Sequence, residues 1–348
     1  MSSNLSQRNF KGDAVKNAQS LCAIWLLVVG LFLSGCGQAS SQNEVLPTSL
    51  PEPSQVVSDS TIIATTASVS KGCKKIAFVV FSQTNSDVYT VCPDGSGLTQ
   101  LTKDPSDDLY PAWSPDGTKI AFASLRNGNS QIYVMEGDGG NPLQLTSDYA
   151  NDFPIWRSNG NQIAFRTTDT KGLWWWRILD LQSNQITELT EPSYDFFFQT
   201  PAWSPDGQYL AYMSLVEQKQ RNDGSSQIHV KNIDGSNDVA LTSDIWANIS
   251  PVWSPEGTKI AFLSERDGIY NSYALYQMVQ DGTNLQRLTP PIFSESAMLT
   301  WSPDGQQIAI SSDVLTGNIY ILDTESKASR ELLSLHDGER ASMPSWQP

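Results

Sequence analysis

The chain has 348 residues, of which 39% are hydrophobic and 17% are charged, and its formal net charge is −15. This length can supply one large or two ordinary domains with a substantial core. The acidic balance disfavours nucleic acid as a partner, because nucleic acid selects basic surfaces, and it also disfavours docking on anionic lipid headgroups.

The first 35 residues have the organisation of an export signal. Residues 1–20 carry Arg8, Lys11 and Lys16 against a single acid, Asp13, and the apolar run "LCAIWLLVVGLFL" follows over residues 21–33. A basic region, a short apolar run and then small residues form a secretory signal peptide. The run is shorter than the roughly 20 residues that a membrane-spanning helix needs.

The sequence "LSGC" at residues 33–36 resembles the lipobox of bacterial lipoprotein signals. That resemblance implies that Cys36 is lipidated and becomes the first residue of the mature chain, which would then be held to a membrane by its lipid. The alternative is an ordinary signal peptide, or an uncleaved anchor, with a chance cysteine. Residues 36–70 are rich in Ser, Thr, Pro and Gln and read as a flexible tether.

One pattern repeats through the rest of the chain at intervals of 43 to 50 residues, a spacing typical of propeller blades. In its clearest copy, a strand at 111–113 is followed by the turn "SPDG", strands at 119–124 and 132–135, a second turn and a strand at 142–146. Four short strands joined by turns predict an antiparallel blade, and no later segment shows helical periodicity, so the fold class is all-β. The copies are marked by Trp113, Trp156, Trp203, Trp253, Trp301 and Trp346.

We therefore predict that residues 71–348 form a six-bladed β-propeller. Blade one would contain strands at 74–81, 87–91 and 98–102 but has no opening strand of its own. The last segment, 343–348, would supply that strand by pairing into blade one, which closes the ring and leaves few exposed sheet edges.

The register of the repeat places Cys73 and Cys92 at facing ends of a hairpin in blade one. An exported protein can keep a disulfide, and one here would contribute about 3 kcal/mol. The alternative is two reduced, buried thiols.

The string "WSPDGTKIAF…IYVM…LT…PAW" resembles the repeat of the TolB-type β-propellers, which is related to the propellers of prolyl-oligopeptidase-type enzymes. The resemblance covers residues 73–348 and implies protein partners. TolB-type proteins carry an additional α/β domain ahead of the propeller, whereas a tether and a lipidated cysteine are expected here. Blade three departs from the pattern, because "IWRSNGNQIAF" lacks the Pro and Asp of the turn.

The two faces of such a propeller should differ in use. The short, regular "SPDG" and "DG" turns share one face and are explained by turn chemistry. The other face holds long, irregular segments that mix acids with aromatics, and long loops often carry function. The alternative is that these aromatics pack between blades and the acids are solvated. The residues that we select as a candidate ligand face are Asp108, Tyr110, Asp152, Phe153, Trp174, Tyr194, Phe197, Asp244 and Trp246.

We expect this face to bind a protein or peptide of the cell envelope, with the protein acting as a monomeric, non-catalytic adaptor. The alternative partner is a polysaccharide, bound or cleaved through paired carboxylates, with Trp174, Trp176 and Trp246 among the residues that would stack on sugar rings. The two histidines, His229 and His336, have no motif partner, and the sequence shows no G-x-S-x-G elbow and no zinc spacing. We therefore expect no cofactor and no metal.

Overall fold

The computed structural model describes residues 72–191, 201–215, 226–268, 271–312, 317–333, 335 and 338–348. The predicted signal peptide and tether lie outside this part of the chain, as do Cys36, Tyr194, Phe197 and His336. Within it, the chain forms six four-stranded antiparallel sheets and contains no helix. None of the described segments is a helix with the length and hydropathy needed to span a bilayer.

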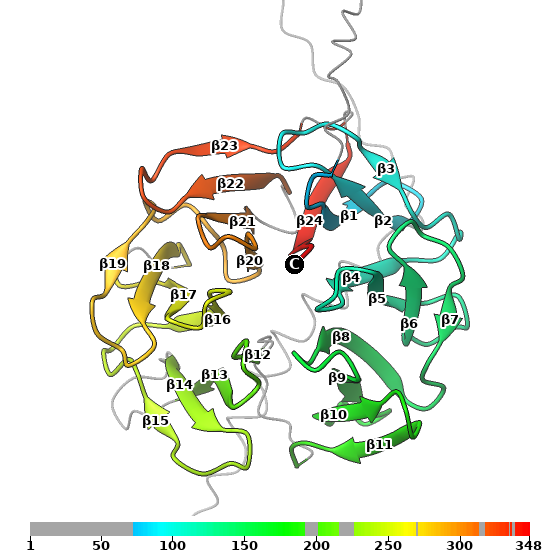
Figure 1. Cartoon of the computed structure of the whole chain (residues 1–348), viewed down its shortest axis with the longest axis horizontal. Helices are drawn as coiled ribbons and strands as arrows, with labels where there is room; N and C mark the ends of the chain where they lie inside the picture. The colour runs from blue at the N-terminus through cyan, green and yellow to red at the C-terminus, as the bar shows by residue number, and fades with distance from the viewer. Residues whose placement is uncertain are drawn as a thin grey trace, which may run out of the picture. The chain divides into compact units, whose positions relative to one another are not determined.

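The six sheets are arranged as the blades of a ring, as predicted (Figure 1). The innermost strands each end at a marker Trp: β4 (Asp108–Trp113), β8 (Ala150–Trp156), β12 (Ala202–Trp203), β16 (Asn248–Trp253), β20 (Leu299–Trp301) and β24 (Arg340–Trp346). The second strands follow the first turn: β5 (Lys119–Ser124), β9 (Gln162–Thr168), β13 (Tyr209–Leu215), β17 (Lys259–Ser264), β21 (Gln307–Ser311) and β1 (Ile76–Phe81).

The third strands are β6 (Gln131–Glu136), β10 (Trp174–Asp180), β14 (Ser226–Asn232), β18 (Ala274–Val279), β22 (Ile319–Asp323) and β2 (Ser86–Val91). The outer strands are short: β7 (Leu143–Gln144), β11 (Gln185–Glu188), β15 (Val239–Ala240), β19 (Gln286–Arg287), β23 (Ser329–Glu331) and β3 (Thr99–Gln100). Short edge strands offer little backbone for pairing with another chain, so they limit edge-to-edge association.

The "LT" that ends five of the six copies of the repeat has a specific structural role. In blade two the hydroxyl of Thr146 accepts a hydrogen bond of 2.9 Å from the backbone N–H of Ile132. Thr102, Thr190, Thr242 and Thr289 accept the equivalent bond from the third strand of their own blades, always from a residue 14 positions earlier. The threonine thus satisfies a backbone N–H of the third strand that the short outer strand leaves unpaired.

The ring closes through the last strand, as expected from the sequence. β24 pairs antiparallel with β1, with Trp346 opposite Ile76 and Arg340 opposite Phe81. Beyond it, the side-chain oxygen of Gln347 accepts a bond of 3.0 Å from the N–H of Lys75, and its amide donates to Gly117 in blade two. The last residues therefore connect blade one to its neighbour as well as completing it.

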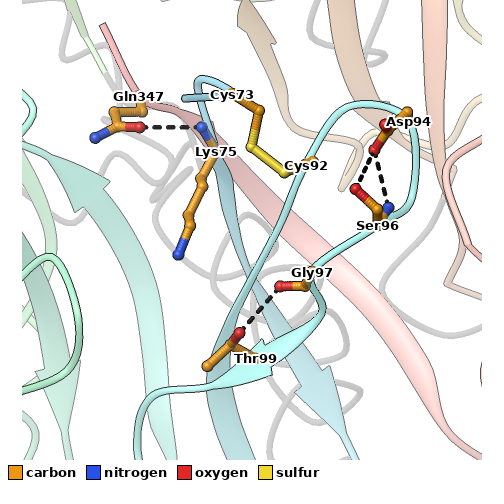
Figure 2. The surroundings of a disulfide bond; sticks show 8 residues. All are labelled: Cys73, Lys75, Cys92, Asp94, Ser96, Gly97, Thr99 and Gln347. Carbon is orange, nitrogen blue, oxygen red and sulfur yellow. Dashed lines mark hydrogen bonds between the residues drawn. A yellow bond between two sulfur atoms is a disulfide. The ribbon is translucent and has the colours of Figure 1, made fainter. Parts of the chain in front are cut away.

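The predicted disulfide between Cys73 and Cys92 is present (Figure 2). Cys73 lies just before β1 and Cys92 directly follows β2, so the bond joins the two strands at the end of the blade where the chain enters it. Both chain ends of the described propeller lie on the face that carries the "SPDG" turns, because β1 starts and β24 ends there.

Candidate binding face

The turns of the "SPDG" face use their polar groups internally. In blade two the Ser114 hydroxyl donates to Asp116 (2.6 Å) and accepts from the N–H of Lys119 (2.9 Å), while Gly117 has a φ of 68°. Hydrogen bonds from Ser114 and Thr118 hold the pKa of the Asp116 carboxyl below its usual value. The polar atoms of Ser114 and Asp116 are therefore used within the turn itself. We call this side of the propeller the turn face.

Blade three keeps the same turn without the usual residues. Gly160 has a φ of 69°, and the N–H of Arg157 donates to the carbonyl of Gln162 at 2.9 Å. The side chain of Asn159 accepts from the N–H of Asn161, as aspartate does in the other blades. The departure in sequence therefore leaves the turn geometry intact.

We call the opposite side of the propeller the loop face. The inner strands of blades two, three and five carry a β-bulge close to this side. The pairing of β4, β8 and β16 shifts register within the stretch before the marker Trp. At this point Tyr110, Phe153, Ser250 and Met343 have left-handed backbones with φ between 50° and 59°, each three residues before its Trp. Such a conformation costs a non-glycine residue roughly 1–2 kcal/mol, and the surrounding strands must hold it.

The bulge brings two of the predicted residues together. The rings of Tyr110 and Phe153 stack with centroids 3.8 Å apart, and the guanidinium of Arg166 lies 4.5 Å from the Phe153 centroid. Arg166 also donates two bonds, of 2.8 and 2.6 Å, to the carboxylate of Asp152. Burial raises the pKa of the Tyr110 hydroxyl well above its usual value. Tyr110, Phe153 and Asp152 thus form one packed unit with Arg166.

Asp108 is not available to a ligand. Its side chain is fully buried, and both of its oxygens accept from Arg126 at 3.2 Å. Burial raises the pKa of this carboxyl, while Ser124 and Arg126 oppose that shift. Asn151 and Asn248 are buried at the same position, five residues before the marker Trp, so this position is structural.

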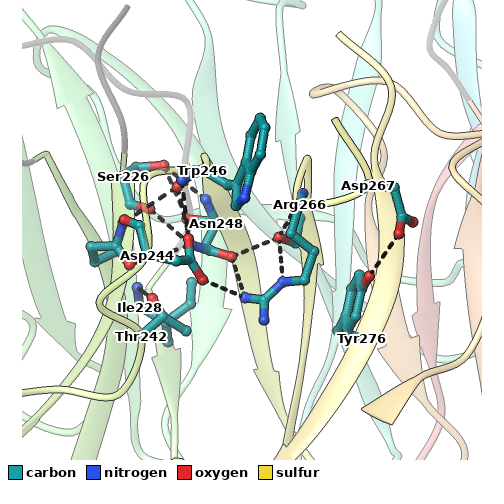
Figure 3. Close-up of polar contacts among 11 residues, drawn as sticks. Ser226, Ile228, Thr242, Asp244, Trp246, Asn248, Arg266, Asp267 and Tyr276 are labelled. Carbon is teal, nitrogen blue, oxygen red and sulfur yellow. Dashed lines mark hydrogen bonds and ion pairs between the residues drawn. The ribbon is translucent and has the colours of Figure 1, made fainter. Parts of the chain in front are cut away.

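Asp244 and Trp246 lie together at the junction of blades four and five (Figure 3). Asp244 accepts from Arg266 (2.9 Å), from the Asn248 amide (2.9 Å) and from the N–H of Trp246 (3.0 Å). Trp246 is half-buried, and the adjacent Ile245 is 49% exposed. Two large apolar side chains therefore lie beside a neutralised ion pair.

Trp174 starts β10, directly after a loop of this face, and is half-buried. Next to it, Trp175 is buried and makes a T-shaped contact with Tyr149, whose ring centroid lies 5.4 Å away and whose side chain is half exposed. Arg177, on the same strand, donates to Asp148 at 2.9 Å. Tyr149, rather than Trp174, is the accessible aromatic residue of this region.

The arginines of the loop face were not predicted, although each neutralises an acid. Arg126, Arg166 and Arg266 pair with the predicted Asp108, Asp152 and Asp244. One signal was available, since Arg126 and Arg266 both follow a strand-ending serine by two residues. The loop face therefore presents aromatic and aliphatic side chains among ion pairs, and it is less acidic than its carboxylates suggested.

His229 lies on β14, away from these residues. Its Nδ1 is 3.0 Å from a carboxylate oxygen of Asp238, and Tyr212 also donates to that carboxylate. Among the residues that the structure describes, no group of three or more His, Cys, Asp or Glu side chains is placed to hold a metal ion.

Fold and site together define an all-β, six-bladed propeller with one face built of tight turns and one of irregular, aromatic-containing loops. The chain belongs to the TolB beta propeller domain family, whose model matches residues 48–220 and 196–348.

Three similar proteins illustrate this relationship. An uncharacterized peptidase, YuxL, of Bacillus subtilis is 27% identical over 42% of this chain and 20% of its own length. A TolB homolog of Chlorobium luteolum is 28% identical over 56% of this chain and 32% of its own. The chain thus spans a third or less of these two relatives. The crystal structure of TolB from Acinetobacter baumannii superposes with a TM-score of 0.68 at 21% identity, covering 79% of this chain and 67% of that one.

Proposed function

We propose that this protein is a lipid-anchored, exported propeller that binds a protein or peptide of the cell envelope through its loop face and acts as a non-catalytic adaptor. The observation that carries the proposal is the difference between the two faces of a TolB-family propeller. The polar groups of the turn face bond within its own short turns, and single apolar side chains such as Leu98 are exposed beside it. On the loop face the exposed apolar side chains of Tyr149 and Ile245 lie in the irregular segments that also carry the arginine–carboxylate pairs. Exposed apolar side chains rimmed by polar groups are typical of protein interaction surfaces.

The ion pairs of the loop face support a protein partner over a catalytic role. The carboxylates of Asp152 and Asp244 are each bound by an arginine at 2.6–2.9 Å. A carboxylate held in this way is poorly suited to act as a general base or nucleophile. It can instead fix the arginine and the aromatic ring beneath it as a rigid platform for a partner.

The loop face is tested by capturing partners from an envelope extract of the native cell with the full-length protein. We expect Tyr149→Ala and Trp246→Ala to reduce the capture of specific partners at least tenfold, because buried aromatic anchors contribute most of the energy at interfaces. Leu98→Ala, an exposed leucine beside the turn face, is the matched control and should change nothing. If both aromatic variants retain every specific partner, the loop face is not the binding surface.

The proposed lipid anchor is tested separately. Cys36→Ala should shift the protein from the detergent phase to the aqueous phase, or leave an unprocessed precursor, because the acyl chains on this cysteine hold it to the membrane. The measurement is detergent-phase partitioning, with Cys73→Ala as a control that removes a different cysteine. Unchanged partitioning of Cys36→Ala would rule out the lipoprotein assignment.

A further inference from the structure

A cavity of about 230 Å³ lies between blades four and five. Its walls combine three apolar side chains, Leu241, Met278 and Leu285, with the polar residues Thr242, Asp244 and Arg266. Pockets that take a whole small-molecule ligand are usually larger, at roughly 300–1,000 Å³, so this volume suits a single residue of a partner.

Arg266 reaches the cavity with donors to spare. Its Nε donates to the Ser264 hydroxyl (2.9 Å), and its Nη2 donates to Asp244 and Asn248 (both 2.9 Å). Figure 3 shows that Nη1 has no such bond among the residues drawn. The guanidinium is held in place because it lies 4.7 Å from the centroid of the Tyr276 ring and is hydrogen-bonded to Asp244 and Asn248. Two N–H groups of a fixed arginine are therefore unused within the described part of the chain.

Thr242 supplies a further donor at the cavity. Its hydroxyl accepts from the N–H of Ile228, as every threonine of the "LT" motif does. The equivalent hydroxyls of Thr102 and Thr146 also donate, to Asp87 at 3.1 Å and to Gln131 at 2.7 Å. Among the described residues, the hydroxyls of Thr190, Thr242 and Thr289 accept the motif's bond and show no such donated bond, so the proton of Thr242 is available beside Arg266.

The cavity therefore joins unused hydrogen-bond donors to an aliphatic wall. Donors without acceptors favour a group that only accepts, and a carboxylate is the strongest such partner for a guanidinium. The apolar wall formed by Leu241, Met278 and Leu285 adds room for an aliphatic side chain beside it. These two features occur together in the last residue of a peptide that ends in leucine or a similar side chain.

We infer that this cavity binds the C-terminal residue of a protein partner, with its free carboxylate on Arg266 and Thr242 and its aliphatic side chain against Met278 and Leu285. The inference rests on the proposed function, because it names the part of the partner that enters the propeller. Asp244 helps by holding the guanidinium in position through Nη2, which leaves the opposite edge for the ligand.

The test uses N-acetyl-leucine, which reproduces a C-terminal leucine, and its neutral amide, N-acetyl-leucinamide. The full-length protein is labelled with ¹³C in its methionine methyl groups, and the spectrum is followed during titration. We expect N-acetyl-leucine to shift the Met278 signal with a dissociation constant on the order of millimolar, whereas the amide shifts it at least tenfold more weakly. Met135 in blade two is the internal reference and should not move.

Two variants make the test independent of protein folding. Arg266→Gln should abolish the response but also removes bonds within the blade. Leu285→Glu changes a side chain that is 43% exposed, so it should leave the fold intact while its negative charge repels the carboxylate and weakens binding at least about tenfold. Leu143→Glu, at an exposed leucine on the outer strand of blade two, is the matched control.

Equal responses to the acid and the amide would overturn carboxylate recognition, and equal shifts of Met278 and Met135 would overturn the site. The inference would also be refuted if N-acetyl-leucine left the Met278 signal unchanged. If Tyr149→Ala and Trp246→Ala still lose their partners in that case, the proposed function stands without it.

Discussion

At the scale of single residues, the position five residues before each marker Trp shows how one site in the repeat can hold either a charge or an amide. Asp108, Asn151 and Asn248 occupy it in blades two, three and five, and all are fully buried. In blade five the side-chain oxygen of Asn248 accepts from Arg266, just as Asp108 accepts from Arg126 in blade two. In these blades the position supplies an acceptor for a donor on a neighbouring segment, and it does not need a negative charge to do so.

Asp108→Asn should consequently change the free energy of unfolding at pH 7 by no more than about 1 kcal/mol. Asp108→Leu leaves Arg126 without its acceptor and should cost about 3 kcal/mol or more. Because burial raises the pKa of Asp108 above its ordinary value of 3.8, the folded state binds this proton more tightly than the unfolded state.

The contribution of Asp108 to stability is therefore present below pH 3.8 and declines as the pH rises through the raised folded-state pKa. Asp108→Asn should gain stability relative to the wild type across that window. Urea unfolding of both proteins between pH 3.5 and 7 measures the difference. A difference that stays constant with pH would contradict the assignment of the raised pKa to Asp108.

At the scale of elements, strands and turns could be predicted because each depends on residues close together in sequence. The Ser114 and Asp116 bonds that form the first turn join residues within five positions of one another. The threonine of the "LT" motif recurs at a constant separation of 14 from its donor. Contacts that are local and recur from blade to blade require the same residue types at the same spacing, so they can be recognised as a repeat in the sequence.

The arrangement of the loop face could not be predicted in the same way. Its ion pairs join residues at irregular separations: Asp152 to Arg166, Asp148 to Arg177 and Asp244 to Arg266. Which arginine meets which acid depends on loop conformation and on bulges that rotate the inner strands. The predicted acids thus lie on the expected side of the propeller, but their neutralisation is visible only in three dimensions.

The disulfide is the covalent element of blade one, and its loss should be measurable. The double variant Cys73→Ser/Cys92→Ser should lower the free energy of unfolding by about 3 kcal/mol, because the bond closes a segment with a sequence separation of 19. Denaturant unfolding with and without reductant checks this. Reductant should destabilise the wild type and leave the double variant unchanged; equal stability of all samples would show that the bond contributes nothing.

At the scale of the whole molecule, the junctions between blades are sealed in two different ways. Between blades two and three, Gln131 accepts from Thr146 (2.7 Å) and from Asn151 (3.1 Å), which forms a polar connection. Between blades five and six, Tyr273, Phe293 and their neighbours form a continuous apolar cluster instead. Polar junctions fix the relative position of two blades through directional bonds, whereas apolar junctions contribute mainly burial.

The closing junction between blades six and one is apolar, and it depends on the final strand. Trp346 is buried with Ile76 and Phe78 of blade one and with Ile321 of blade six. Trp346→Ala should cost about 3–5 kcal/mol, as for other buried tryptophans, and lower the melting temperature by about 10 °C in a domain of this size. Trp346→Phe retains most of the buried surface and should lose less than half as much.

The full chain without residues 340–348 should fail to melt cooperatively, because β1 loses β24, one of its two partner strands, and the apolar junction opens. A peptide of residues 340–348 added in trans should restore the transition by pairing with β1, whereas the same peptide with Trp346→Ala should not. Circular dichroism melting curves give both results. A shortened chain that melts as sharply and at the same temperature as the wild type would mean that the five other junctions hold the ring without its closing strand.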